Sequence, residues 1–290
     1  MEVPEEIRQK LLVFQKSEIT EHHIYQKLAD RFGPSENRRV LESIADDELR
    51  HYNIWRAYTH QDVAPDPWKV WKYSWITRIF GLTFGVKLME RGEEDAQDSY
   101  GQLQEAIPEA GTIMNEENRH ENALLDMLNE ERLRYTGSIV LGLNDALVEL
   151  TGALAGLTLA LQNTRLIALT GSITGIAAAF SMGASEYLST KTEETAKQPL
   201  RASIYTSGAY LITVLILILP YLILSNYYLC LGFTLAAAVL VIALFNYYVS
   251  VAKDEPFRRR FFEMAGLSLS VAAFSFLIGL LMRVFLDVEI

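Results

Sequence analysis

Five long runs of apolar residues in the C-terminal part of the chain constrain the fold more than any other feature. They cover about residues 138–161, 166–188, 203–224, 228–250 and 265–286. A helix rises 1.5 Å per residue, so each run can cross the roughly 30 Å hydrocarbon core of a membrane. Five such helices in a soluble protein would need a large polar shell, which this sequence lacks. The sequence therefore predicts five membrane-spanning helices.

Basic residues are distributed unevenly over the loops between these runs. The loop after the second run holds Lys191, Lys197 and Arg201, and the loop after the fourth holds four basic residues. The loop after the first run holds only Arg165, and the loop after the third holds none. By the positive-inside rule, we expect the N-terminal part and both basic loops on the cytoplasmic side of the cell inner or plasma membrane. The C-terminus is expected on the opposite side.

The N-terminal part differs sharply from the membrane part, which predicts two domains, 1–135 and 136–290. Residues 1–135 hold 26 acidic and 17 basic residues and all five histidines, whereas residues 136–290 hold 10 acidic and 9 basic residues. The absence of a basic stripe argues against nucleic acid as a partner. The acidic N-terminus lacks an apolar core segment, so no signal peptide is expected. The single Cys230 excludes a thiolate metal site.

The N-terminal part is predicted to form an antiparallel four-helix bundle, which makes the whole chain all-α. Apolar residues recur three and four positions apart, and Gly33-Pro34 and Pro108 separate helices. Ser35 is expected to be an N-cap, and a break is expected near Gly81 to Gly85. The four predicted helices cover about residues 4–31, 35–59, 71–106 and 109 onward.

The motif Glu-x-x-His occurs twice in this part, as Glu48-Leu-Arg-His51 and Glu117-Asn-Arg-His120. Residues three apart on a helix share a face, so each pair can present a carboxylate and an imidazole to one ion. The two copies are expected on the second and fourth helices. A single copy would mean little, because acidic helices usually display solvated charge.

The first and third helices each carry Glu-x6-Tyr, from Glu18 to Tyr25 and from Glu93 to Tyr100. The chain thus repeats one pair of helices, the first with Glu-x6-Tyr and the second with Glu-x-x-His. This repeat is typical of a carboxylate-bridged two-metal site in a bundle core. Oxygen and imidazole ligands suit iron or manganese, so Fe²⁺ in a di-iron site is predicted, with Mn²⁺ as the alternative. The predicted ligands are Glu18, Glu48, His51, Glu93, Glu117 and His120. Three spare carboxylates could bind a further or shifted ion, namely Glu21, Glu90 and Glu94.

This first part resembles the rubrerythrin branch of the ferritin-like superfamily, because it carries the duplicated motif over about 130 residues. It lacks the Cys-x-x-Cys pairs of the rubredoxin-like module. The resemblance therefore implies a ferritin-like fold and a metal site, but it leaves peroxidase chemistry open.

Aromatic residues form a stripe in the segment around the start of the third predicted helix, at Trp68, Trp71, Trp75, Phe80 and Phe84. Basic residues are interspersed, so the stripe could lie on a membrane surface. Such stripes more often form a bundle core, and that interpretation is favoured here.

Charged residues inside membrane spans are costly and mark functional sites by default. The first span contains Asp145 and Glu149, four residues apart, and the second contains Met182 and Glu186 at the same spacing. These four residues are predicted to line a path for a divalent cation. Small residues such as Gly152, Gly156, Gly171 and Gly175 are expected to let the two spans approach closely.

The run from Ile139 to Gly156, with its Asn-Asp pair, and the run from Phe180 to Ser189 resemble the vacuolar iron transporter family. The resemblance implies a homodimer that exchanges ferrous iron, and sometimes manganese, for protons. It also implies that Asp145 and Met182 line the path. Eukaryotic members insert a long acidic segment after the second span, which is absent here; the combination with the bundle resembles membrane-bound ferritins that export iron.

The sequence therefore predicts a proton-coupled exporter of a divalent metal, with a cytoplasmic bundle that captures or senses the ion. One rival is a membrane-anchored enzyme that oxidises iron or reduces peroxide. Five spans with internal carboxylates are more than an anchor requires. Another rival is a sensor bundle that gates transport without passing ions onward.

Overall fold

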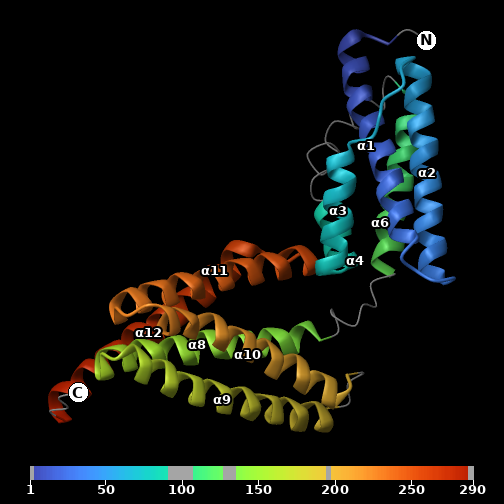
Figure 1. Cartoon of the computed structure of the whole chain (residues 1–290). Coiled ribbons are helices and arrows are strands. Elements are labelled where there is room, and N and C mark those ends of the chain that lie inside the picture. The colour runs from blue at the N-terminus through green and yellow to red at the C-terminus, as the bar shows by residue number, and fades with distance from the viewer. Residues whose placement is uncertain (1–2, 91–106, 127–134, 194–196, 287–290) are drawn as a thin grey trace. The chain divides into compact units, whose positions relative to one another are not determined.

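The computed structural model describes residues 3–90, 107–126, 135–193 and 197–286 of the chain (Figure 1). The described residues form helices joined by loops and contain no strand, so the all-α prediction is confirmed. The chain divides into two compact units, Met1–Glu130 and Glu131–Ile290, called here the first and second units.

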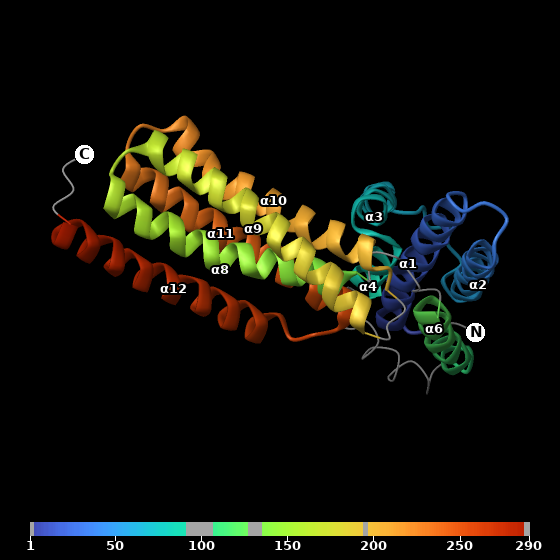
Figure 2. The same ribbon diagram turned by 90° about the horizontal axis from the view of Figure 1, so that it is seen from below.

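The first unit is built from helices that lie side by side (Figures 1 and 2). Helix α1 packs along α2 and α3, and α6 contacts α2 and α4. Because α1 and α2 are joined by a short loop, they form an antiparallel hairpin. The described helices are α1 (Glu5–Ala29), α2 (Glu36–Thr59), α3 (Pro67–Phe80), α4 (Leu82–Glu90) and α6 (Glu109–Asp126).

Local sequence signals explain where these helices begin and end. Ser35 caps α2, since its side chain accepts a hydrogen bond from the backbone N–H of Arg38, as predicted. Asp66 caps α3 in the same way. Gly81 separates α3 from α4 with a φ of 100°, a conformation that glycine adopts without the strain of a side chain. The predicted break in the third helix is therefore confirmed.

The prediction that the tryptophan stripe forms bundle core is wrong for most of its members. Trp68, Trp71 and Trp75 are 64%, 51% and 46% exposed, and Phe80 is exposed as well. The physical reason is the helical period: α3 turns a different face, which carries the buried Tyr73, toward the bundle. Phe84, beyond the break at Gly81, is buried as expected.

The second unit consists of five helices long and apolar enough to cross a membrane, as the sequence predicts. Their most apolar windows have mean hydropathies from 1.4 to 2.5. The helices have 25 to 30 residues, so each is at least about 37 Å long, more than a hydrocarbon core requires. They are α8 (Thr136–Leu161), α9 (Thr164–Thr192), α10 (Pro199–Ile223), α11 (Tyr227–Lys253) and α12 (Phe257–Leu286).

Helix α8 packs against all four other helices of this unit, most extensively against α12 and α10. Glycines permit this close packing: a Cβ on Gly142 would collide with the backbone carbonyl of Thr206 on α10. The expectation that these small residues let the first two spans approach each other closely holds for Gly171, which faces Leu154 of α8, but other glycines serve contacts with other helices. Gly156 faces Ser275 of α12, and Gly175 faces Val214 of α10. Sequence spacing shows that a helix has a small-residue face but does not show which neighbour uses it.

Candidate metal centre

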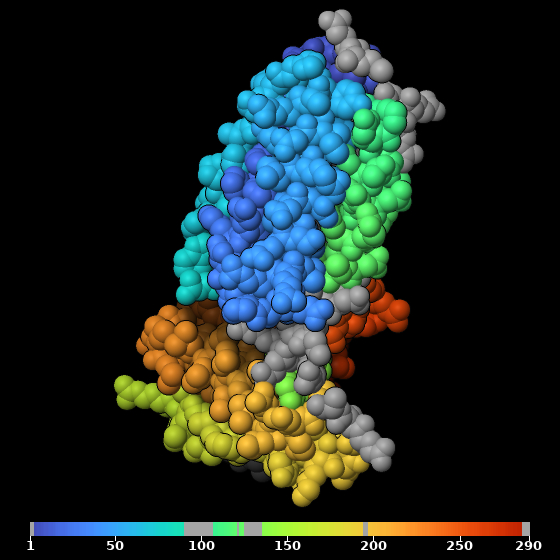
Figure 3. Space-filling view, turned by 90° about the vertical axis from the view of Figure 1, so that its right-hand side faces the viewer, coloured from blue at the N-terminus to red at the C-terminus, as the bar shows by residue number. Residues whose placement is uncertain are grey.

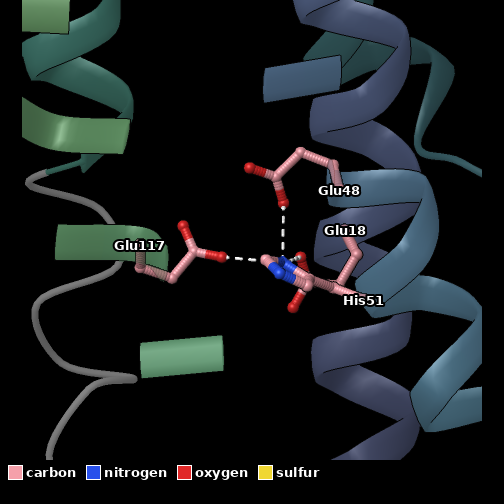
Figure 4. A group of neighbouring side chains, drawn as sticks. All are labelled: Glu18, Glu48, His51 and Glu117. Atoms are coloured by element: carbon pink, nitrogen blue, oxygen red, sulfur yellow. Dashed lines mark ion pairs between the residues drawn. The ribbon is translucent and has the colours of Figure 1, made fainter. Parts of the chain in front are cut away.

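Five carboxylate and imidazole side chains of the first unit meet between three helices. Glu18 lies on α1, Glu48 and His51 lie on α2, and Glu117 and His120 lie on α6. Ligand atoms of Glu18, Glu48, His51 and Glu117 all lie within 4.8 Å of one another, and this group could hold a metal ion (Figure 4). Both Glu-x-x-His motifs thus contribute to a single centre.

The centre is buried within the first unit. Exposure is 4% for Glu18, 1% for Glu48, 0% for His51 and 8% for His120. Helices α2 and α6 lie against each other along one face of the unit, where their side chains cover the space between them (Figure 3). Charged groups are almost never buried unless they are paired or coordinate an ion, so this burial indicates a built site.

The two glutamates between the imidazoles each face both histidines. Glu48 places Oε2 3.6 Å from Nδ1 of His51 and Oε1 3.3 Å from Nδ1 of His120. Glu117 places Oε1 3.0 Å from Nδ1 of His51 and Oε2 3.6 Å from Nδ1 of His120. The imidazole ring centroids are 5.9 Å apart. Each of the two carboxylates thus turns one oxygen toward each imidazole.

Several atoms of the centre lack the hydrogen bonds that buried polar atoms normally have. Buried polar side-chain atoms in folded proteins nearly always have a partner, and exceptions call for an explanation such as an ion. A divalent cation would satisfy these atoms, and the mixture of oxygen and nitrogen suits iron or manganese. The atoms are Glu48 Oε2, His51 Nδ1, Glu117 Oε1 and His120 Nδ1.

A second layer of carboxylates fixes the orientation of both imidazoles. Nε2 of His51 lies 2.8 Å from Oε2 of Glu116, and Nε2 of His120 lies 3.0 Å from Oδ2 of Asp47. In each pair, the acid and the histidine lie on different helices, one on α2 and the other on α6. Arg50 forms ion pairs with both acids. An Nε2–H held by a carboxylate turns Nδ1 toward the centre and makes it a better metal ligand.

This second layer was not predicted from the sequence. A signal was present, because an acidic residue directly precedes each Glu-x-x-His motif: Asp47 before Glu48, and Glu116 before Glu117. Neighbouring residues on a helix point about 100° apart, so these acids cannot share the ligand face of their own helix. Only the packing of α2 against α6 brings each acid to the histidine of the other helix.

Replacing both outer acids, Asp47→Asn with Glu116→Gln, is expected to weaken metal binding by about 10- to 100-fold without removing a ligand. The imidazoles would keep a hydrogen-bond partner but lose the negative charge that orients them. Competition between the full chain and a chelating dye for Mn²⁺ measures the effect. Glu42→Gln is the matched control, since Glu42 lies on α2 and pairs with Arg38. Equal affinity in the double variant and in the control would contradict the orienting role.

Trp55 positions the carboxylate that α1 contributes. Its indole Nε1–H donates a hydrogen bond to Oε1 of Glu18 over 3.0 Å, and Oε2 of Glu18 lies 3.6 Å from Nδ1 of His51. Trp55 is fully buried and follows His51 by four residues, so both lie on one face of α2. This role of Trp55 was not predicted from the sequence.

The electrostatics of the centre favour protonated imidazoles when no cation is bound. Burial by itself would lower the pKa of His51, but the surrounding carboxylates of Glu117, Glu18 and Glu48 raise it well above its usual range. For His120, burial is likewise outweighed by carboxylates, and the pKa is raised to about 10. Burial raises the pKa of Glu18. A cation must therefore displace protons to enter.

The other predicted ligands fall into two groups. Glu93 and Glu94 lie outside the described residues, as do Tyr100 and the side chain of Glu90. Glu21 is buried on α1, but it is not a member of the four-residue group that could hold an ion.

The four residues predicted to line the membrane path lie on α8 and α9. Glu149 accepts a hydrogen bond from the hydroxyl of Tyr210 over 2.9 Å, and Glu186 accepts one from Ser138 over 2.6 Å. Asp145 is half-buried and interacts with Glu149 one turn away. Met182 packs against the apolar core of the unit.

These four residues are spread along the hairpin of α8 and α9 rather than gathered at one point. Glu186 is level with Ser138, whereas Asp145 and Glu149 lie seven and eleven residues further, about 10 and 16 Å along the helix. Since α8 and α9 form a hairpin, Met182 lies one turn from Glu186 on the side toward Asp145. Within the described part of the chain, the carboxylates of this unit do not form a compact group like that of the first unit. The four side chains therefore follow one another in a row along the two helices.

Comparison with known proteins bears on the second unit. Residues 136–198, which contain α8, α9 and all four residues of this row, match the model of the VIT family. No curated protein matches the chain. The family match and the five apolar helices support a membrane domain of this kind, and they indicate a membrane metal transporter.

Proposed function

We propose that the chain exports a divalent metal ion, Fe²⁺ with Mn²⁺ as the alternative, from the cytoplasm in exchange for protons. The observation that carries the proposal is the VIT family match over residues 136–198, the segment that contains the carboxylates of α8 and α9. The metal-binding geometry of the first unit supports it, since a transporter of another substrate would have no use for such a centre.

The first unit is proposed to be a ferritin-like, rubrerythrin-type bundle with two ions. Glu18 and His51 would hold one ion, His120 would hold the other, and Glu48 and Glu117 would bridge them. The duplicated motif assigns Glu93 as the counterpart of Glu18 for the second ion. The bundle would capture cytoplasmic ions for export.

In the second unit, ions are proposed to move along the row formed by Glu186, Met182, Asp145 and Glu149. Carboxylates in a membrane exchange metal ions for protons because both neutralise a charge that hydrocarbon disfavours. Protons arriving from the far side would therefore release the ion and couple export to the proton gradient. Glu149 is exposed within one chain. Because a charge facing lipid is unfavourable, this exposure supports a homodimer that covers it.

Metal flux in proteoliposomes tests the function directly. Fe²⁺ or Mn²⁺ movement should require the protein and should increase when a pH gradient is imposed. The rival function, an iron-oxidising or peroxide-reducing enzyme anchored by its spans, predicts turnover without flux. Removal of residues 1–130 separates delivery from sensing, since a sensor would leave flux intact but unregulated.

Binding of Mn²⁺ to the full chain is expected to release protons, about one per imidazole, and its affinity should rise with pH. The sign follows from the raised pKa values: both imidazoles are protonated at neutral pH, and a metal ligand must be neutral. Proton release is measured in weakly buffered solution with a pH indicator.

The variant His51→Ala with His120→Ala should abolish this proton release. His60→Asn is the control, because asparagine tolerates the left-handed backbone at His60, where φ is 53°. Binding that is independent of pH between about 6 and 9 would contradict the assigned ligands.

Single cysteines in a Cys230→Ser background should show the predicted topology. Lys191→Cys, in the last turn of α9, is expected to react from the cytoplasmic side. Ser225→Cys, between α10 and α11, and Ile290→Cys are expected to react only from the other side. Lys191 and Ser225 are both exposed in the structure. Labelling of positions 191 and 290 from the same side would refute the topology.

A further inference from the structure

Helix α3 has two chemically distinct faces. Trp68, Trp71 and Trp75 lie three and four residues apart and form one exposed face, called here the tryptophan face. Val70 and Tyr73 lie on the opposite face and are buried in the apolar core of the first unit. A surface helix normally exposes polar residues, so three neighbouring exposed indoles require an explanation.

The three indoles are neighbours on the surface of α3. The rings of Trp68 and Trp71 are stacked, with centroids 4.9 Å apart, and the rings of Trp71 and Trp75 are 6.3 Å apart. The guanidinium of Arg78 lies over the Trp75 ring, 5.7 Å from its centroid. The three rings therefore lie next to one another and present one apolar patch instead of separate side chains.

The charge around the tryptophan face is opposite to that of the surrounding domain. Residues 67–80 contain Lys69, Lys72 and Arg78 and no acidic residue, although residues 1–135 carry nine more acidic than basic residues. Asp66 precedes the helix, and its carboxylate accepts hydrogen bonds from the backbone N–H groups of Trp68 and Lys69. The basic residues therefore flank an aromatic surface without an acid between them.

We propose that the tryptophan face docks onto the surface of the membrane, with its indoles at headgroup level and its basic residues on anionic lipid phosphates. Tryptophan favours the membrane–water interface because its ring is apolar and its N–H is polar. Lysine and arginine are drawn to the negative potential of anionic lipid. The spans of the same chain keep the first unit close to a bilayer at all times.

A second copy of the chain fits this face less well than lipid does. In a two-fold symmetric pair, the same patch would meet itself, so Lys69, Lys72 and Arg78 would lie in the same interface as the basic residues of the second copy. Like charges across an interface oppose association. The docking inference does not rest on the transport function, because it concerns only α3.

Tryptophan fluorescence of the full chain can test the proposal, because all four tryptophans lie in the first unit. Trp55 is fully buried and serves as an internal reference, whereas the other three form the tryptophan face. The protein is placed in nanodiscs of phosphatidylcholine and phosphatidylglycerol with brominated acyl chains. We expect the lipid bromines to quench most of the emission of the three exposed indoles, and aqueous acrylamide to quench little of it.

In the charge-reversal variant Lys69→Glu with Arg78→Glu, brominated lipid should quench less of the tryptophan emission and acrylamide should quench more of it. Each removed basic residue is expected to weaken docking roughly fivefold. Its matched control is Lys27→Glu with Arg39→Glu, which makes the same charge change at exposed positions of α1 and α2. An unchanged Trp55 contribution to the emission shows that both variants remain folded.

Two outcomes would overturn the proposal. Strong acrylamide quenching with no lipid quenching means that the tryptophan face lies in water. Protection from both quenchers means that protein covers the face, as in a pair of first units. Either result leaves metal flux unaffected, so a failure here is distinct from a failure of the proposed function.

Discussion

Asp145→Asn is expected to abolish proton-coupled metal flux, lowering it by more than about tenfold, which corresponds to at least about 1.4 kcal/mol. The side chain lies in the interior of α8, where it interacts with Glu149. Asparagine keeps the size and the hydrogen-bonding capacity of the side chain but removes its charge and its titration. An ion that exchanges with a proton at this position therefore loses its binding site. Flux of Fe²⁺ or Mn²⁺ into proteoliposomes under an imposed pH gradient measures the change.

Two comparisons separate a transport role of Asp145 from a structural one. Asp254→Asn makes the same chemical change at the C-terminal end of α11 and should leave flux intact. The Asp145→Asn protein should still fold and should still bind metal in the first unit, since the centre there contains no residue of α8. Wild-type flux in Asp145→Asn would remove this residue from the mechanism, because a role in helix packing alone survives the exchange.

Glu48→Ala with Glu117→Ala is expected to lower the metal content of the full chain by about two ions. Both carboxylates face both imidazoles, so their removal leaves each histidine with too few ligands to hold an ion. Metal content after dialysis against Mn²⁺, compared with that of the unmodified chain, gives the number lost. Circular dichroism checks that the helices persist.

The single variant Glu48→Ala distinguishes a bridged pair of ions from two independent sites. Because one oxygen of Glu48 faces each histidine, its loss should weaken both ions together. Independent sites would lose one ion and keep the other at its original affinity. Glu36→Ala, in the first turn of α2, is the control for removal of an acid from this helix. An unchanged metal content in the double variant would show that the assigned ligands are wrong.

Much of the fold follows from local patterns along the chain. The five spans, the N-cap at Ser35 and the break at Gly81 depend on residues close in sequence, so each could be predicted from the residues alone. The two Glu-x-x-His motifs were recognisable for the same reason, because spacing on one helix decides which side chains share a face.

Other features depend on which helix packs against which, and sequence analysis missed or misassigned them. The tryptophans of α3 were expected in the core but are exposed, because the helix turns its Tyr73 face inward. Gly156 was expected to face the second span but faces α12. An amphipathic pattern shows that a helix has faces, whereas the choice of neighbour depends on how the surfaces of distant segments fit together.

The sequence by itself determined the all-helical class, the five apolar spans, and the residue types available for a metal centre. Only the tertiary structure decided that Glu48 and Glu117 each face both histidines, and that Asp47 and Glu116 reach across to the histidine of the opposite helix. The physical reason is that helix formation and hydrophobicity act over a few residues of chain. Metal-ligand geometry joins side chains more than sixty residues apart, and their distances are set by the packing of whole helices.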